Sequence, residues 1–281
     1  GARVIQEEKD FDYENQWFAS VRDETFDTNQ DPLPIPVDRA GGGARLPSFT
    51  GSSSDTLWSG KAQLNYRPQE DLLIYGGYRR GVKAGGFNAK LNDFNPGPED
   101  SEIPYDEEIL HAFEVGFKWT FLENRARLNG SAYYYDYNGY QAFVFTGSSG
   151  LITNRDAKYK GGELELSITP VAGLNANFGA SYIDAEVKDL EIAPGVFRDV
   201  RPTFTPEWQL NGLVSYDLPF ARETGIWSVQ ADASYQSSRH YNIRNFQADL
   251  MNDFAVLNLQ ISWESLDGTW RATGCISSPS N

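Results

Sequence analysis

The chain has 281 residues, a formal net charge of −15 and an aromatic content of 14%, so it lacks the clustered lysines and arginines that nucleic-acid phosphates demand. One cysteine and two histidines allow no internal disulfide and argue against a metal site built from histidines. No 18 consecutive residues are apolar, which excludes a transmembrane helix but not membrane strands, whose polarity alternates.

The N-terminal third predicts strands separated by long polar segments. Residues 2–12 form the first predicted strand, and residues 13–55 form a long polar loop. Apolar and polar residues then alternate over 58–66, and a tight turn at 68–71 leads into a further strand that ends near Gly81. A second long polar segment follows this strand and leads up to Tyr105.

Residues 105–145 carry the clearest strand pattern of the chain. Over 113–121 the odd-numbered positions are aromatic or valine, while the even-numbered positions are glutamate, glycine, lysine and threonine. A second alternating run follows the turn at 122–125, so the segment predicts a β-hairpin. If apolar residues of one strand pair with apolar residues of the other, Trp119 lies opposite Leu128 and Phe117 lies opposite Gly130. An aromatic ring over a bare glycine is a known way to fix the register of a curved sheet.

The C-terminal half repeats this organisation. We predict loops at 146–156 and 187–204, and alternating strands at 163–168, 174–182, 208–216, 227–235 and 255–263. The predicted fold class is therefore all-β, an antiparallel meander of about eleven long strands.

The predicted connections alternate in length. Short turns fall at 68–71, 122–125, 170–173, 219–225 and 265–268, and every other connection is long and polar. Outer-membrane barrels combine short periplasmic turns with longer outer loops, and aromatic girdles mark their two interfaces. Aromatic residues here lie near the short turns, such as Trp119 and Trp263, or toward the long loops, such as Trp58 and Trp208. Alternation alone fits both a membrane barrel and a soluble sandwich core. The alternating loop lengths favour the membrane barrel.

The chain resembles the barrel of TonB-dependent outer-membrane receptors in three stretches, YGGYRRGVKAGGFN, YDEEILHAFEVGFKWTFLENRARLNGSAYYYDYNGYQ and NRDAKYKGGELELSITPVAGLNANFGASYIDAE. The resemblance implies a 22-stranded barrel closed by an N-terminal plug domain. It also implies contact with the lipid of a Gram-negative outer membrane and uptake of ferric siderophores or another scarce, bulky nutrient. The TonB–ExbB–ExbD complex would drive uptake by pulling on a short N-terminal motif.

The sequence departs from this family pattern at both ends. The plug, the coupling motif, about the first half of the barrel and the closing aromatic strand are missing from it. We interpret residues 1–276 as an open partial barrel, roughly strands eleven to twenty-one, and residues 277–281 as an irregular tail. Such an internal fragment, or truncated or frameshifted product, should transport nothing alone.

The candidate ligand-facing or plug-facing residues are Arg79, Arg80, Lys83, Phe87, Tyr137 and Tyr140. The three basic residues form a cluster in an acidic chain and suit an anionic ligand or the plug, although ordinary lumen salt bridges are the preferred explanation. Tyr137 and Tyr140 lie in the half of 126–145 that should stand above the membrane, where cross-strand packing competes with ligand stacking. No catalytic, cofactor-binding or metal-ligating residue is predicted, and no GxSxG elbow occurs.

Three hypotheses follow. The first is a partial barrel of a TonB-dependent receptor, a transporter and not an enzyme. The second is a complete small outer-membrane barrel, acting as a diffusion channel or as a hydrolase that uses His111 or His240 as its base. The third is a soluble β-sandwich binding module. Pairing of residues 2–12 with 269–276 would favour a closed barrel, and burial of both aromatic rows would favour a sandwich.

Overall fold

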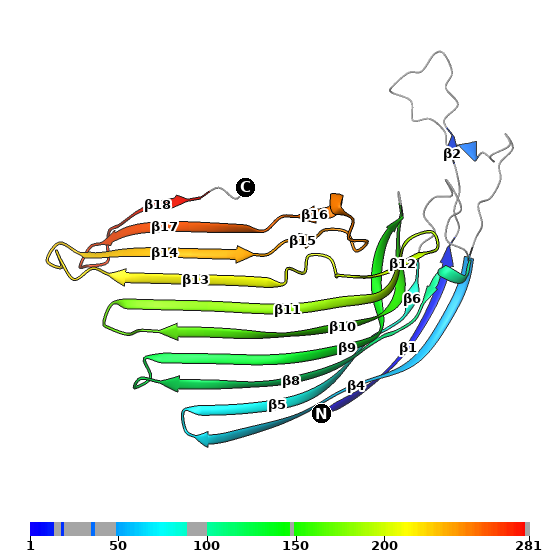
Figure 1. Ribbon diagram of the computed structural model, residues 1–281, viewed down its shortest axis with the longest axis horizontal. Coiled ribbons are helices and arrows are strands. Elements are labelled where there is room, and N and C mark those ends of the chain that lie inside the picture. Colours follow the sequence, from blue (N-terminus) through cyan, green and yellow to red (C-terminus); the bar gives the residue numbers. More distant parts are fainter. Residues whose placement is uncertain (14–17, 20–34, 37–48, 89–99, 147–148, 279–281) are drawn as a thin grey trace, which may run out of the picture.

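The computed structural model describes residues 1–13, 18–19, 35–36, 49–88, 100–146 and 149–278. Eleven antiparallel strands cross the main sheet in chain order (Figure 1). They are β1 (Ala2–Tyr13), β4 (Phe49–Gln69), β5 (Leu72–Lys83), β8 (Glu108–Phe121), β9 (Ala126–Thr146), β10 (Ser149–Ile168), β11 (Leu174–Ala193), β13 (Trp208–Asp217), β14 (Ile226–Gln236), β17 (Phe254–Glu264) and β18 (Arg271–Ser277). A further strand, β12 (Val196–Val200), pairs only with β11. The predicted all-β meander of about eleven strands is confirmed.

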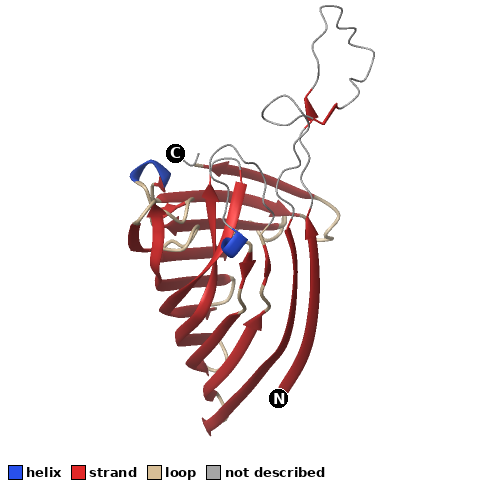
Figure 2. Cartoon of the chain, turned by 90° about the vertical axis from the view of Figure 1, so that its right-hand side faces the viewer, coloured by secondary structure: helices blue, strands red, loops and turns tan. Residues whose placement is uncertain are grey.

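The two outer strands of this sheet are paired on one side only. Within the described residues β1 pairs with β4 alone and β18 with β17 alone, so the sheet is open. Figure 2 shows a single curved layer of strands. The alternative of a closed small barrel, which requires residues 2–12 beside 269–276, is therefore wrong.

The remaining elements are short. Three pairs of two-residue strands are β2 (Phe18–Ala19) with β3 (Ile35–Pro36), β6 (Gly86–Phe87) with β7 (Pro104–Tyr105), and β15 (Arg239–His240) with β16 (Leu250–Met251). Two helical turns, η1 (Asp100–Glu102) and η2 (Gln247–Asp249), complete the described part. None of the helices in this part has the length and apolar character that crossing a membrane takes.

The two faces of the sheet differ sharply in polarity. One row of cross-strand partners is almost entirely apolar: Phe117, Gly130, Leu164, Ala180, Leu210, Tyr235 and Ala255. The neighbouring row, on the opposite face, is mostly polar: Lys118, Asn129, Glu165, Gly179, Asn211 and Ser234. Leu164 is 48% exposed and Leu210 43% exposed, so within the described residues no second layer covers the apolar face. The sandwich alternative is therefore wrong.

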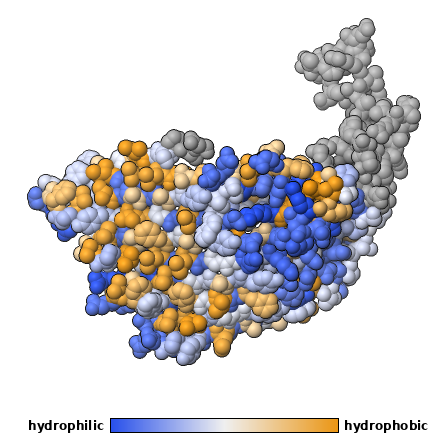
Figure 3. All heavy atoms as spheres, in the orientation of Figure 1, coloured by the Kyte–Doolittle hydropathy of each residue, from blue (hydrophilic) through white to orange (hydrophobic). Residues whose placement is uncertain are grey.

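The exposed apolar side chains form a belt beside the short turns. Figure 3 shows them gathered over the half of the sheet that carries these turns, while hydrophilic side chains dominate the other half. Exposed aromatic residues lie at both borders of the belt, with Tyr66 and Trp119 near the short turns and Trp58 and Trp208 at the far side. On β8 the belt spans about nine residues, the length that a tilted strand needs to cross a bilayer core.

The predicted register of the 105–145 hairpin is confirmed. Trp119 lies opposite Leu128, and Phe117 lies opposite Gly130. A Cβ atom added to Gly130 would come within 2.5 Å of Cε1 of the Phe117 ring, because that ring lies over the glycine. Any larger residue at this position must therefore displace the ring.

We expect Gly130→Val to destabilise the folded sheet by about 1–3 kcal/mol, because overpacking forces the ring of Phe117 out of place. The measurement is urea-induced unfolding of the full-length protein in lipid vesicles. Gly76→Val is the matched control, since a Cβ atom at Gly76 would meet only the Glu114 carbonyl oxygen at 3.8 Å. Equal losses in both variants would contradict a register role for Gly130.

The strands extend further from the short turns than predicted. Residues 49–55, 149–156 and 187–193 were predicted as loops, but they belong to β4, β10 and β11, and these loop predictions are wrong. In 49–55 small and polar residues on both faces hide the alternation, although the backbone still pairs, as in Phe11 with Gly51. The two ends of the sheet still differ, because strands at the end opposite the short turns continue beyond the belt (Figure 1). Of the predicted tail, residues 279–281 lie outside the described residues.

Candidate functional site

The polar face at the projecting end of the strands holds Arg79. Its guanidinium lies 3.2 Å from Oε2 of Glu114, and the Tyr75 hydroxyl donates a 3.0 Å hydrogen bond to Oε1 of the same carboxylate. β5 and β8 bring these side chains together because Gly77 lies directly opposite Glu114 and adds no side chain between them. The Arg79 side chain remains 53% exposed, so it is paired and still open to a further anion.

Arg80 and Lys83 do not converge with Arg79 into one basic cluster. Consecutive residues of a strand face opposite sides, and Arg80 lies 4.2 Å from the ring centroid of Trp58, on the side of the apolar belt. It also donates a hydrogen bond to the Trp58 carbonyl oxygen. Lys83 shares the face of Arg79 and lies opposite Glu108 at the end of β5. Only Arg79 and Lys83 therefore share the polar face.

Phe87 packs inside an aromatic group at the base of β6. Its ring centroid lies 5.1 Å from that of Phe11 and 6.1 Å from that of Phe49. The next residue, Asn88, is 5% exposed and forms hydrogen bonds with the backbone N–H and carbonyl of Ile152, at 2.8 and 2.9 Å. These contacts fasten the segment to β1, β4 and β10, so Phe87 serves as an anchor.

Tyr137 and Tyr140 pack against each other and against Tyr159. The ring centroid of Tyr137 lies 5.6 Å from that of Tyr140 and 5.0 Å from that of Tyr159. Burial, followed by the charge of Glu108, raises the pKa of Tyr137 to about 12, and burial also raises the pKa of Tyr159. Both phenols therefore stay protonated at neutral pH.

The three tyrosines border a buried apolar cluster that the sequence reasoning missed. Its members are Ala142, Val144, Ala157, Val187, Leu190, Ile192, Val200 and Ile243. They come from β9 to β12 and from the 237–249 loop, much of which was predicted to be loop. The alternation of Leu190 and Ile192 in the predicted loop was the available signal.

Three neighbouring strands are irregular at one level, among the residues of this cluster. Gly139 on β9 has a φ of 68°, the β9–β10 register shifts between Arg155 and Ala157, and Asp189 on β11 has a φ of 48°. Bulges bend a strand and increase its twist. The projecting ends of β9 to β11 therefore depart from the direction of the belt and carry the tyrosines with them.

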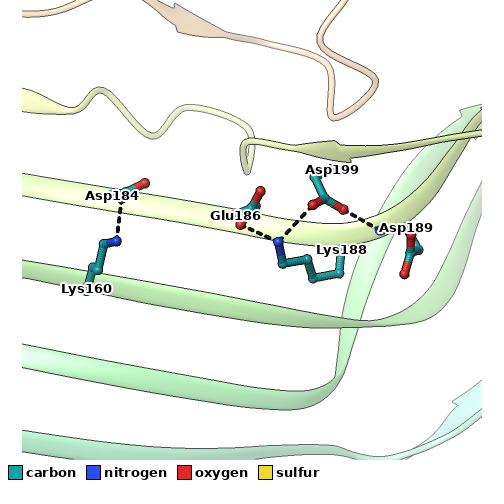
Figure 4. A network of polar contacts seen from close by, with 6 residues as sticks. All are labelled: Lys160, Asp184, Glu186, Lys188, Asp189 and Asp199. Atoms are coloured by element: carbon teal, nitrogen blue, oxygen red, sulfur yellow. Dashed lines mark hydrogen bonds and ion pairs between the residues drawn. The ribbon is translucent and has the colours of Figure 1, made fainter.

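A network of ion pairs holds β12 to β11 at this level (Figure 4). Nζ of Lys188 lies 2.8 Å from Oδ2 of Asp199 and 2.6 Å from Oε2 of Glu186. The backbone N–H of Asp189 donates a 3.0 Å hydrogen bond to Asp199. The hydrogen bond from Lys188 is the main cause that lowers the pKa of Asp199. Such exposed charges mark the level at which the strands have left the apolar belt.

His111 and His240 were the bases required by the hydrolase alternative. Nδ1 of His111 shares a 2.8 Å hydrogen bond with the Tyr78 hydroxyl. Burial lowers the pKa of His240. In the part of the chain that the structure describes, neither imidazole hydrogen-bonds a serine, so the geometry gives no support to a serine hydrolase.

Comparison with protein families places most of the chain in one family. The family model described as "TonB dependent receptor-like, beta-barrel" matches residues 13–274. The "Probable TonB-dependent siderophore receptor PiuA" of Acinetobacter baumannii is 23% identical over 140 residues, which are 50% of this chain and 19% of that protein.

Solved structures share the fold. The ferric yersiniabactin uptake receptor FyuA from Yersinia pestis superposes with a TM-score of 0.62 at 16% identity, over 81% of this chain and 33% of its own. The ferric-catecholate import receptor Fiu from E. coli K12 gives a TM-score of 0.61 at 14% identity, over 94% of this chain and 35% of its own. The chain thus spans about a third of the length of these neighbours.

Proposed function

The chain belongs to the TonB-dependent receptor family, and from this premise we propose that it forms part of an outer-membrane barrel that imports a ferric siderophore or another scarce, bulky nutrient. The observation that carries the proposal is the exposed apolar belt on one face of an open sheet whose other face is polar. A bilayer accepts such a sheet only if further strands pair with β1 and β18, because unpaired backbone groups have no partner in lipid.

The proposed orientation follows from the same two faces. The apolar belt would face the lipid of the Gram-negative outer membrane, and the polar face would line a lumen. The short turns would lie on the periplasmic side, where the TonB–ExbB–ExbD complex acts, and the projecting strands would lie outside the cell. We infer the class of transported substrate from the similarity of the chain to siderophore receptors.

Of the six candidate residues, Arg79 and Lys83 are the ones we propose as plug-facing or ligand-facing. Both lie on the polar face, and Arg79 keeps half of its side chain exposed. Arg80 contacts Trp58, while Phe87, Tyr137 and Tyr140 are held in aromatic packing. We therefore propose a structural role for these four residues.

Uptake of radioactive iron tests the function. Cells that depend on the full-length protein should accumulate iron from at least one ferric siderophore, and uptake should stop when TonB is deleted. Arg79→Gln should lower this uptake, while Arg80→Gln, a matched change on the opposite face, should leave it near the wild-type value. Uptake that persists without TonB, or that is absent for every iron complex supplied, would contradict the proposal.

A further inference from the structure

Three tyrosines meet beside the point where the pairing of β9 with β10 is interrupted. Tyr137 and Tyr140 come from β9, and Tyr159 comes from β10. Tyr137 is paired with Ala157, and the register then shifts between Ala157 and Arg155, so the ladder of the two strands is irregular directly beyond Tyr137. The three rings therefore lie where the projecting end of this hairpin begins.

The small side chain of Ala157 leaves room for the rings of Tyr137 and Tyr159 to approach each other. Tyr159 pairs with Tyr135 and Tyr137 pairs with Ala157, so Tyr137 and Tyr159 are diagonal neighbours on one face of the two strands. Aromatic side chains are long enough to meet across such a diagonal. Their ring centroids lie 5.0 Å apart, and the two ring planes make an angle of 49°.

This arrangement of the two rings is close to that of a dityrosine unit. In dityrosine a single carbon–carbon bond joins the two ring positions beside the hydroxyl groups, and the rings are twisted against each other. Because the backbones of β9 and β10 already pair here, side-chain motion alone can bring these two carbons of Tyr137 and Tyr159 together. Tyr133 and Tyr135 are stacked at 28° on one strand, an arrangement that a bond between ring edges does not fit.

Both phenols are accessible to oxidation. Tyr137 and Tyr159 are partly exposed, so a small oxidant and water reach their rings. Burial of the remaining part is the main cause that raises the pKa of both hydroxyl groups above the usual value for tyrosine. Each hydroxyl therefore keeps its proton at neutral pH and releases it to water only when the ring loses an electron.

We propose that Tyr137 and Tyr159 form a site of oxidative cross-linking, at which peroxide activated by an iron chelate joins β9 to β10 through dityrosine. Each phenol loses one electron and one proton, and the two radicals couple through one carbon–carbon bond. The hydrogen atoms at the two bonded ring positions then move to the two oxygens, which restores both phenols. The balance is the loss of two hydrogen atoms, which reduce one hydrogen peroxide to two molecules of water.

The cross-link would give the projecting hairpin a covalent staple. Tyr133, which shares the face of Tyr137, lies opposite Glu114, so the pair belongs to the polar face of the sheet. The site goes beyond the proposed function, which contributes only the iron chelates that would pass this face. When such a chelate and peroxide are both present, the staple would limit the opening of β9 from β10.

Mild oxidation of the full-length protein in detergent micelles tests the site. The probe is hydrogen peroxide with ferric citrate, and photolysed tris(bipyridine)ruthenium with persulfate serves as a second one-electron oxidant. Lysines and arginines border residues 128–155 and the dipeptide 159–160, so trypsin releases both. The expected product joins these two peptides, with a mass two hydrogen atoms below their sum, and it should come from monomeric protein that shows dityrosine fluorescence.

Phenylalanine variants separate the pair from its neighbours, because they keep each ring and its packing and remove only the hydroxyl group. Tyr137→Phe and Tyr159→Phe should each abolish the cross-linked peptide. Tyr133→Phe, the matched control on the same strand and face, should leave its yield near the wild-type value. Survival of the product in Tyr137→Phe, through Tyr135 or Tyr140, would overturn the assignment of the pair.

The remaining outcomes are also decisive. Absence of the product with both oxidants, or its presence only in dimeric material, would overturn the site, and its absence with ferric citrate and peroxide alone would overturn iron and peroxide as its source. Hydrogen exchange of the cross-linked protein should show stronger protection in 140–155 than Tyr137→Phe treated in the same way. Cross-linking without iron uptake would refute the proposed function alone, whereas TonB-dependent iron uptake without cross-linking would refute this site alone.

Discussion

Replacing Leu210 with arginine is expected to destabilise the sheet in a bilayer by about 2–4 kcal/mol. Leu210 is 43% exposed and lies in the apolar row between Ala180 and Tyr235. If lipid covers this face, the guanidinium must leave water for hydrocarbon or distort the strand to reach the interface.

The control for Leu210→Arg is the neighbouring substitution Gln209→Arg. Gln209 is also exposed, but it lies on the polar face between Ser181 and Gln236. We expect this variant to change the free energy of unfolding by less than about 0.5 kcal/mol. Urea unfolding of both variants of the full-length protein in lipid vesicles, followed by tryptophan fluorescence, gives the comparison. A larger loss for Gln209→Arg would reverse the assignment of the two faces.

The fold could be predicted wherever the two faces of a strand meet different surroundings. Over 113–121 one parity is apolar and the other mostly polar, so the period of two identifies the strand and fixes Phe117 opposite Gly130. Above the belt both faces meet water or polar neighbours, so residues 50–55 show no period although they pair with β1. The backbone hydrogen bonds that build those segments do not depend on side-chain polarity.

The candidate site was less predictable, because it depends on which face of the sheet each side chain lies on and on contacts between residues far apart in the sequence. Arg79 and Arg80 look like a cluster in the sequence, yet strand alternation alone places them on opposite faces, and that step was available. The contact between β12 and the 237–249 loop is different. Arg198 and Arg244 meet because a loop folds back over β12, and nothing in the residue pattern specifies that approach.

The second large effect is expected at Leu190. This side chain is fully buried, at 0% exposure, in the cluster that joins β9 to β12 with Ile243. Leu190→Ala should lower the free energy of local opening by about 2–5 kcal/mol, since it removes buried methyl groups and leaves a cavity. The cluster lies beyond the belt, so we expect the projecting ends to open while the belt strands stay protected.

Hydrogen exchange by peptide mass measures this difference directly. Protection should fall for residues 187–200 and for the 237–249 loop, because Ile243 loses its packing partner. Val196→Ala, at a residue that is 50% exposed in the same hairpin, should leave protection nearly unchanged. If protection falls equally in the belt strands, the projecting ends and the belt form one cooperative unit. If it falls only in the projecting ends, the cluster holds these ends together as a unit that opens separately from the belt.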